Sequence, residues 1–434
     1  MPKTSGHFLK NVGISLFFMA SSYFFRFLLP VSVKSANFAV MNIIKILRIN
    51  RLRCRHWVLI VLLLLVTLTR MIPRWGIIYT FGVYPYIGAF LSHVSGWIPF
   101  AVGDLFIALS IAWVILYPVY QLQIRKILVR KGMIGKGKEV KSLKKLVVFG
   151  RVAEYLLWVY AWFYIAWGLN YSQPNIFFRL RMMPAQVSKQ TLREFAYRYV
   201  DSLNCLSEDR GVKSENLKCV MGKSVSQELK DRTSKRVLQG YNNLAKSPVF
   251  MGINAPFNQH PHAKTMLFTP LSSMAGVTGS MGPFFCEYTL NGDVLAREYP
   301  ATCAHEFAHF LGVANEGEAN FYSYLICTAS PDKAVRFSGY YQILYHVVAN
   351  VYDILGEKEG DALIRRIRPE ILQMAKQDHL YWRNKRCKVI DTAQDVMFDL
   401  YLRGNNVKEG RKSYSGVIML ILSWEEKMSH TYPR

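Results

Sequence analysis

Three long apolar runs constrain what this chain can fold into. A helix needs roughly 20 apolar residues to cross the hydrocarbon core of a bilayer. The sequence provides runs of about this length at residues 57–72, 100–120 and 146–168. We therefore predict a membrane anchor of three transmembrane helices over residues 57–168. Before it, residues 1–56 form an N-terminal extension, whose apolar stretch at 13–30 fits an additional span, a signal-like segment or an interfacial helix.

The positive charge of the chain follows these runs. Lys and Arg number 54 against 29 Asp and Glu, which gives a formal net charge of +25. Basic clusters lie at residues 45–55 and 125–145, where cytoplasmic loops are expected to carry them. Everything after residue 168 is then expected outside, and Pro73 to Pro99 should be an extracytoplasmic loop on the membrane surface. Membrane topology accounts for the charge, so we expect a lipid bilayer as partner and no nucleic acid.

The remaining part of the chain, residues 169–434, is long enough to form its own core. Its first part is expected to be helical, and strand signals follow at Lys264–Thr269 and Phe284–Leu290. The glycine-rich stretch between these two segments, residues 276–283, is expected to be flexible. The fold class predicted for the whole chain is therefore membrane-anchored and mainly α, with an α+β domain containing a small sheet.

One short stretch of this domain carries the chemistry. His305-Glu306-Phe307-Ala308-His309 matches the pattern H-E-x-x-H. In a helix, His305 and His309 are about one turn apart, so both imidazoles can bind one metal ion. Glu306 follows the first imidazole and can reach a water on the open side of that metal, as a general base would. We expect one Zn²⁺ ion as cofactor.

A zinc site of this kind needs a third protein ligand. Gly312 can end the first helix in a left-handed conformation, with a tight turn over residues 313–315 before a second helix that begins near Glu316. We predict Glu316 as the third metal ligand and keep Glu318 as the alternative ligand. Asn320, one turn after Glu316, can accept a hydrogen bond from a ligating imidazole and so orient it.

These two motifs resemble those of the gluzincin peptidases, in which H-E-x-x-H is followed by N-E-x-x-x-D or E-x-x-A-D. Residues 315–320 match that second pattern, except that Asn320 replaces the Asp. The resemblance implies a zincin-like metallopeptidase domain, in which a Tyr or His donates a hydrogen bond to the tetrahedral oxyanion. The candidates for this donor are Tyr340, Tyr341, His346 and Tyr414.

The layout of the whole chain is similar to a family of bacterial membrane proteins of unknown function, DUF3810. The matching motifs are W-G-L-N-Y at 167–171, G-x-x-G-x-x-x-P-F at 276–284, H-E-x-A-H-x-x-G at 305–312, E-x-E-A-N-F at 316–321 and S-G-Y at 338–340. The similarity covers roughly residues 57–425. It implies a zinc metallopeptidase in the bacterial inner (cytoplasmic) membrane, and it supplies no substrate.

We therefore expect a multi-pass membrane protein whose domain at residues 169–434 is an extracytoplasmic zinc-dependent endopeptidase acting on a protein or peptide. The alternative is a non-catalytic membrane sensor or scaffold that retains a structural metal site. A Glu306→Gln exchange separates the two, because only an enzyme depends on that carboxylate. The sequence does not specify the oligomeric state.

Overall fold

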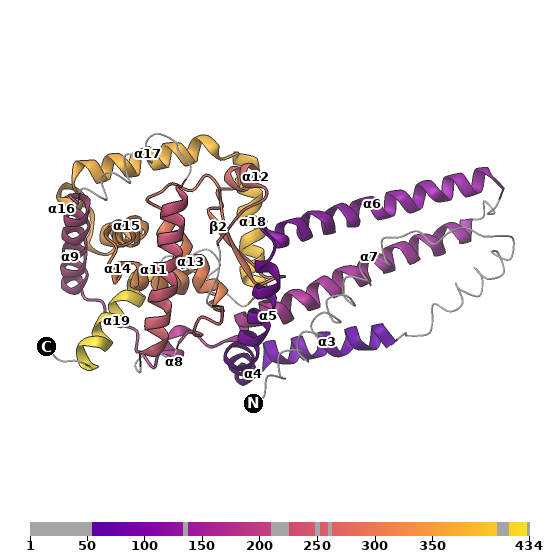
Figure 1. Ribbon diagram of the computed structural model, residues 1–434, viewed down its shortest axis with the longest axis horizontal. Coiled ribbons are helices and arrows are strands. Elements are labelled where there is room, and N and C mark those ends of the chain that lie inside the picture. Colours follow the sequence, from indigo (N-terminus) through magenta and orange to yellow (C-terminus); the bar gives the residue numbers. More distant parts are fainter. Residues whose placement is uncertain are drawn as a thin grey trace, which may run out of the picture.

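A computed structural model describes residues 54–132, 138–209, 225–247, 252–258, 263–405 and 416–431. These residues are mainly helical and form one small sheet, as predicted. A long arm of helices projects from a rounded domain (Figure 1). The predicted N-terminal extension, residues 1–56, lies outside these ranges except for its last three residues, which begin the first described helix.

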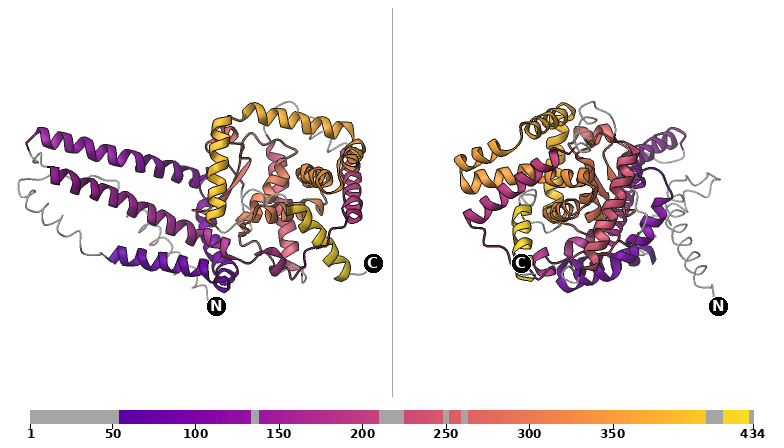
Figure 2. Two further views of the ribbon diagram at one scale, coloured as in Figure 1. Left: turned by 180° about the vertical axis from the view of Figure 1, so that it is seen from behind. Right: turned by 60° about the vertical axis from the view of Figure 1, so that its left-hand side comes forward.

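The arm consists of three helices that run side by side (Figures 1 and 2). They are α3 (Cys54–Met71), α6 (Val102–Arg130) and α7 (Lys138–Ala166), and they correspond to the three predicted spans. Their apolar side chains are largely uncovered; Leu116, for example, is 62% exposed and Phe149 is 71% exposed. Helices satisfy their own backbone groups, so such surfaces are suited to lipid. The protein is therefore membrane-associated.

The segment predicted as a surface loop, Pro73 to Pro99, is helical instead. It forms α4 (Pro73–Ile78), the π-helix η2 (Tyr79–Val83) and α5 (Tyr84–Gly96). This prediction was wrong because Pro73 and Pro85 lie in first turns of helices, where proline is tolerated. Within the described ranges, Pro73–Gly96 is the fourth helical segment long and apolar enough to cross a membrane. It lies crosswise to the arm where the arm meets the domain (Figure 1), and is the most buried of the four.

The domain is built around α13 (Tyr299–Phe310), which α11 (Gln227–Lys246), α14 (Glu316–Thr328) and α15 (Lys333–Leu355) surround. The outer helices are α9 (Lys189–Ser207), α16 (Glu357–Arg366), α17 (Pro369–Lys385), α18 (Lys388–Gly404) and α19 (Val417–Thr431). Short elements complete the chain: η3 (Gly168–Ser172), α8 (Ile176–Arg179) and α12 (Thr269–Met274). One buried apolar cluster runs from Val66 of α3 and Tyr164 of α7, through Tyr84 of α5, into the domain, so the two parts share a core.

The sheet has three short strands in the order β1-β3-β2. The strands are β1 (Lys264–Thr265), β2 (Gly279–Gly282) and β3 (Glu287–Leu290). β1 is parallel to β3, whereas β2 is antiparallel and pairs Gly279 with Leu290. The predicted strands at 264–269 and 284–290 are therefore shortened. The prediction that 276–283 is flexible was wrong, because residues 279–282 pair with β3 and pack on α13.

Candidate metal centre

The local turn between α13 and α14 follows the sequence. Gly312 has a φ of +95°, which confirms the predicted left-handed helix end. Asn315 caps the next helix, since its side-chain oxygen accepts a hydrogen bond of 3.1 Å from the Glu318 N–H. α14 then begins at Glu316, as predicted, and folds back along α13. The turn therefore brings Glu316 over the helix face that carries both histidines.

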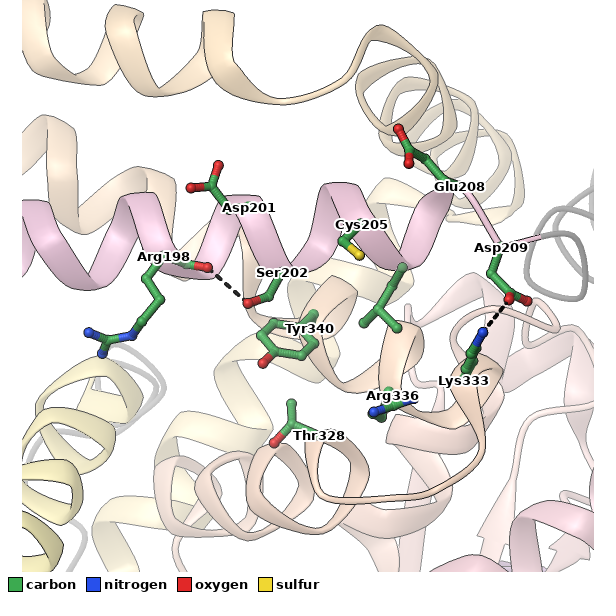
Figure 3. A pocket seen from close by; sticks show the side chains of 11 residues that line it. Arg198, Asp201, Ser202, Cys205, Glu208, Asp209, Thr328, Lys333, Arg336 and Tyr340 are labelled. Atoms are coloured by element: carbon green, nitrogen blue, oxygen red, sulfur yellow. Dashed lines mark hydrogen bonds and ion pairs between the residues drawn. The ribbon is translucent and has the colours of Figure 1, made fainter. Parts of the chain in front are cut away.

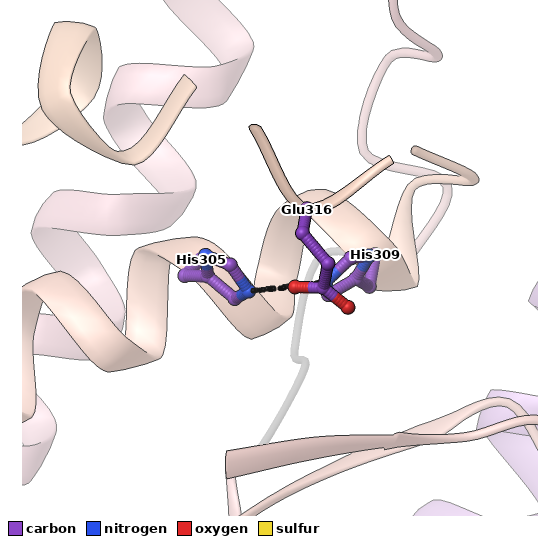
Figure 4. A group of neighbouring side chains, drawn as sticks. All are labelled: His305, His309 and Glu316. Atoms are coloured by element: carbon purple, nitrogen blue, oxygen red, sulfur yellow. Dashed lines mark hydrogen bonds and ion pairs between the residues drawn. The ribbon is translucent and has the colours of Figure 1, made fainter. Parts of the chain in front are cut away.

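Three donor atoms converge on one point (Figure 4). The His305 Nε2 lies 3.1 Å from the His309 Nε2 and 3.1 Å from the Glu316 Oε2. The His309 Nε2 lies 3.3 Å from the same carboxylate oxygen. A tetrahedral zinc ion bound at about 2.0–2.1 Å separates its ligand atoms by roughly 3.3 Å. The three atoms are therefore spaced as the ligands of one small divalent ion would be.

The other nitrogen of each imidazole is already engaged. The His305 Nδ1 lies 2.8 Å from the Asn320 Oδ1, and the His309 Nδ1 lies 2.6 Å from the Val313 carbonyl oxygen. Both acceptors require Nδ1 to carry the proton, which leaves each Nε2 with a free lone pair. Two such lone pairs facing each other would repel, and a cation between them removes the repulsion. The donor set therefore fits a metal ion.

The electrostatics of these side chains also support a metal ion at this point. Burial by itself raises the pKa of Glu316, but the neighbouring His309 and His305 outweigh it and hold that pKa well below its usual range. Burial lowers the pKa of His309, yet the Glu316 and Glu306 carboxylates and the Val313 carbonyl bring it to about 9. The surroundings of His309 and Glu316 therefore favour positive charge at this point, as a divalent ion would supply.

Glu306 lies beside this group, between α13 and the sheet. Its side chain is 5% exposed, and burial raises the pKa of its carboxyl, with the two histidines opposing this and Glu316 adding to it. A Cβ added to Gly279 would stand 2.4 Å from the Glu306 Oε1. Only glycine at the start of β2 therefore leaves room for this carboxylate, which explains a glycine in a strand.

With this geometry in place, the chain can be compared with known proteins. Residues 79–422 match the family described as "Protein of unknown function (DUF3810)". The chain belongs to this family. The match begins at η2 and ends in α19, so in this DUF3810 protein it includes α6, α7 and the whole metal centre. No curated protein and no solved structure matches the chain.

The alternative ligand Glu318 is directed elsewhere. Its carboxylate forms a buried ion pair with Arg179 of α8 and accepts a hydrogen bond of 3.1 Å from the Ile176 N–H. Arg179 is itself buried and also donates to the Gly252 carbonyl. Glu318 therefore holds α8 against α14, and the structure brings Glu316 and not Glu318 to the two histidines.

The predicted oxyanion donors are dispersed. Tyr340 lines a separate surface pocket with Arg198 and Arg336 (Figure 3), and its ring packs on Tyr199 and Tyr324. The Tyr341 hydroxyl donates a 2.6 Å hydrogen bond to Asp378 instead. Neither tyrosine reaches the metal centre.

The two remaining candidates for the oxyanion donor are His346 and Tyr414. His346 lies one turn of α15 beyond Gln342, whose side chain contacts Asn320 at 3.5 Å. Burial lowers the pKa of His346, which keeps it neutral. It is thus on the side of α15 that flanks the metal centre. Tyr414 lies outside the described residues.

Sequence reasoning missed Tyr401, on α18. Burial raises the pKa of its hydroxyl, the hydrogen bond from Tyr171 opposes this, and the Glu316 carboxylate is close enough to add to it. The Tyr401 ring packs edge-on against Tyr171 of η3 and Phe163 of α7. Tyr171 also packs on Trp167, whose ring lies against His309, so Tyr401 is two rings away from a proposed ligand. It lies 85 residues beyond Glu316 in the sequence, and no local motif marks it.

Four side chains donate hydrogen bonds to the end of α13, the helix that carries both histidines in this DUF3810 protein. The last carbonyls of a helix have no partner within it. Here they accept hydrogen bonds from outside: His309 from Trp167 (2.9 Å), Phe310 from Tyr84 (2.7 Å), Leu311 from Asn254 (2.9 Å) and Gly312 from Gln173 (2.7 Å). Two of the donors, Tyr84 and Trp167, belong to the ends of the membrane-associated helices. The metal centre is thus fixed to the membrane anchor.

Proposed function

We propose that this protein is a membrane-anchored, zinc-dependent metallopeptidase with a zincin-like domain. The observation that carries the proposal is the convergence of the His305, His309 and Glu316 donor atoms beside the buried Glu306 carboxylate. When bound, zinc would polarise a peptide carbonyl and acidify a water. Within the described residues the group supplies three ligands, which favours a catalytic site with an open position over a closed structural one.

The residues around the site have separate tasks. Glu306 would take a proton from the attacking water on its carboxylate and pass it to the amine that leaves. Its raised pKa suits this task, because a carboxyl that releases and regains a proton works best with a pKa nearer neutrality. Tyr401 or His346 would donate a hydrogen bond to the oxyanion. Asn320 and the Val313 carbonyl would fix the orientation of the two imidazoles.

The sheet supports a peptide as substrate. β2 is an edge strand of the described sheet, and Gly279 at its start touches the Glu306 side chain. An extended peptide can pair its backbone with such an edge, which would place a peptide bond near Glu306. The proposed substrate is therefore an extended or unstructured segment of a protein.

The distribution of charge supports an extracytoplasmic domain. The end of α6 farthest from the domain carries Arg125, Lys126, Arg130 and Lys131 (Figure 1). Basic residues favour the cytoplasmic side, so the domain at the opposite end of the arm would face outward.

The test uses the full chain purified in detergent, with zinc content measured by elemental analysis and cleavage measured on unfolded casein. Wild type should bind one zinc ion and cleave, and a chelator should stop cleavage. Glu306→Gln should keep the metal and lose turnover. Glu316→Gln should lose the metal, whereas the control Glu318→Gln should keep it. A Glu306→Gln protein that cleaves like wild type would disprove this mechanism, and metal binding without any cleavage by wild type would favour a sensor or scaffold.

A further inference from the structure

Helix α18 exposes an apolar stripe that no described residue covers. Val389 is 78% exposed, Val396 55%, Met397 71% and Leu400 65%. Thr392 and Ala393, between them, are exposed as well. These positions follow a helical spacing of three and four residues, so they form one continuous face, and part of it lines a shallow apolar depression.

The charged and apolar faces of this helix are arranged in the opposite way to those of a surface helix on a soluble protein. Asp391, Asp395 and Asp399 recur every four residues and are half-buried, on the side that faces the protein. A water-exposed helix normally turns its acids outward and its apolar residues inward. Here the uncharged, apolar side points outward. A contiguous exposed face of this kind indicates a binding surface.

The location of α18 identifies what covers this face. The helix runs crosswise to the arm, at the level where the arm enters the domain (Figures 1 and 2). Its C-terminal end is attached to the arm: the Tyr164 hydroxyl donates a 2.8 Å hydrogen bond to the Asn405 Oδ1, and Arg70 donates to the Gly404 carbonyl. The C-terminal end of the stripe therefore lies next to α3 and α7, whose apolar side chains are also exposed.

A second apolar element extends the same surface at the other end of α18. Leu267, Phe268, Leu271 and Met274, in and before α12, are each 41–55% exposed. α12 contacts α18, and the Cys387 N–H donates to the Met274 carbonyl at 3.0 Å. The same stretch is tied to the first turn of α6, since the Leu267 N–H donates to Asp104 at 2.8 Å. The apolar surface therefore reaches both α6 and α7.

We propose that α18 is an interfacial helix, which lies flat on the bilayer surface from which the domain projects and inserts Val389, Val396, Met397 and Leu400 among the lipid chains. Amphipathic helices bind at this depth through their apolar face. The inserted helix is the one that carries Tyr401 on its inner side. Lipid contact therefore holds one wall of the metal centre at a fixed height above the membrane.

The test measures the depth of α18 in full-length protein reconstituted in lipid nanodiscs, one copy per disc. Cys54, Cys205, Cys219 and Cys387 are replaced by serine, and a single cysteine is introduced by Met397→Cys. The matched control is Lys358→Cys, because Lys358 is exposed on α16 at the far end of the domain (Figure 1). Each cysteine carries an environment-sensitive fluorophore, and spin-labelled lipids act as quenchers.

We expect the fluorophore at position 397 to be quenched at least about threefold more strongly than the one at 358, with a blue-shifted emission. Adding Val396→Asp and Leu400→Asp should reduce its quenching to the control value. Equal quenching at both positions would overturn the proposal, as would quenching that survives the two Asp exchanges. Discs with two copies in which position 397 is shielded from lipid would instead identify a second copy of the chain as the occupant.

Discussion

The indole N–H of Trp167 donates a 2.9 Å hydrogen bond to the backbone carbonyl of His309. The first residue directly follows α7, and the second is a proposed metal ligand at the end of α13. Their rings also lie close, with centroids 6.4 Å apart in an edge-on arrangement. The membrane anchor therefore positions a ligand and does more than tether the domain.

Trp167→Phe should weaken both folding and metal binding. The exchange keeps most of the ring but removes one of two donors to the buried His309 carbonyl, which keeps the Gly312 N–H at 2.9 Å, so the cost is about 0.5–1.5 kcal/mol. Thermal unfolding in detergent, with zinc and with chelator, measures the effect. The control is Trp162→Phe, which removes an indole hydrogen bond to the Phe284 carbonyl away from the metal centre. Equal metal affinity in the two variants would contradict the positioning role of Trp167.

Gly279→Ala should stop turnover while leaving the metal in place. The added methyl group would stand 2.4 Å from the Glu306 Oε1 and 2.7 Å from its carboxyl carbon, so the carboxylate must move. A misplaced general base should lower kcat by roughly 10²-fold or more. Ser280→Ala is the control, because Ser280 is the exposed neighbour in the same strand. Cleavage and zinc content are measured together, and an alanine variant of full activity would show that Glu306 is free to shift.

Tyr401→Phe distinguishes the oxyanion donors. If the hydroxyl of Tyr401 stabilises the transition state, its removal should reduce kcat by roughly 10²-fold, with zinc content and KM little changed. His346→Gln is measured in parallel, since His346 is the other candidate near the site. Tyr340→Phe should have no effect, because that residue lines the separate pocket of Figure 3. A normal rate for Tyr401→Phe and a low one for His346→Gln would assign the role to the histidine.

The stability of the domain should fall as the pH rises towards neutrality. Burial, together with the nearby Asp378 carboxylate, raises the pKa of Glu298 to about 7, against the hydrogen bond from Trp382. The folded state therefore binds a proton more tightly than the unfolded state does. Stability from this group is present at low pH and is lost between about pH 4.5 and 7, by up to roughly 3 kcal/mol.

Glu298→Gln should remove this dependence, because the amide remains neutral at every pH. Thermal unfolding of both proteins in detergent, at intervals from pH 5 to 8, provides the comparison. Wild type should lose stability relative to the variant across this range. The same pH profile for both proteins would rule out Glu298 as the titrating group.

The sequence predicted which residues form the candidate metal centre because their spacing is local. His305 and His309 are four residues apart, so helix geometry alone places them on one face. Gly312 and Asn315 specify a turn, and this turn brings Glu316 back within 3.1 Å of His305. The choice between Glu316 and Glu318 needed more. It depends on Arg179, more than a hundred residues earlier in the chain, which forms a buried ion pair with Glu318.

The wrong predictions for residues 73–99 and 276–283 also have their cause in the way the chain packs. The few charges and many aromatics of residues 73–99 suggested a loop on the membrane surface, but Pro73 and Pro85 lie in the first turns of helices. The glycines at 279 and 282 suggested flexibility, but β3 pairs with their backbone. The Glu306 carboxylate also occupies the space that a side chain at position 279 would need. A glycine is compatible with both outcomes, and only its neighbours in space decide between them.

By itself, the sequence determined the apolar helices, the membership of DUF3810 and the spacing of the histidines, because each depends on residues close together in the chain. Tertiary structure decided that Tyr401 packs on Tyr171 near the candidate metal centre, that Trp167 donates to the His309 carbonyl, and that α18 turns its apolar face outward. The contacts involved join residues far apart in the chain, such as Trp167 with His309 (142 residues) and Tyr164 with Asn405 (241 residues). Long-range packing, rather than local periodicity, fixes which side chains meet there.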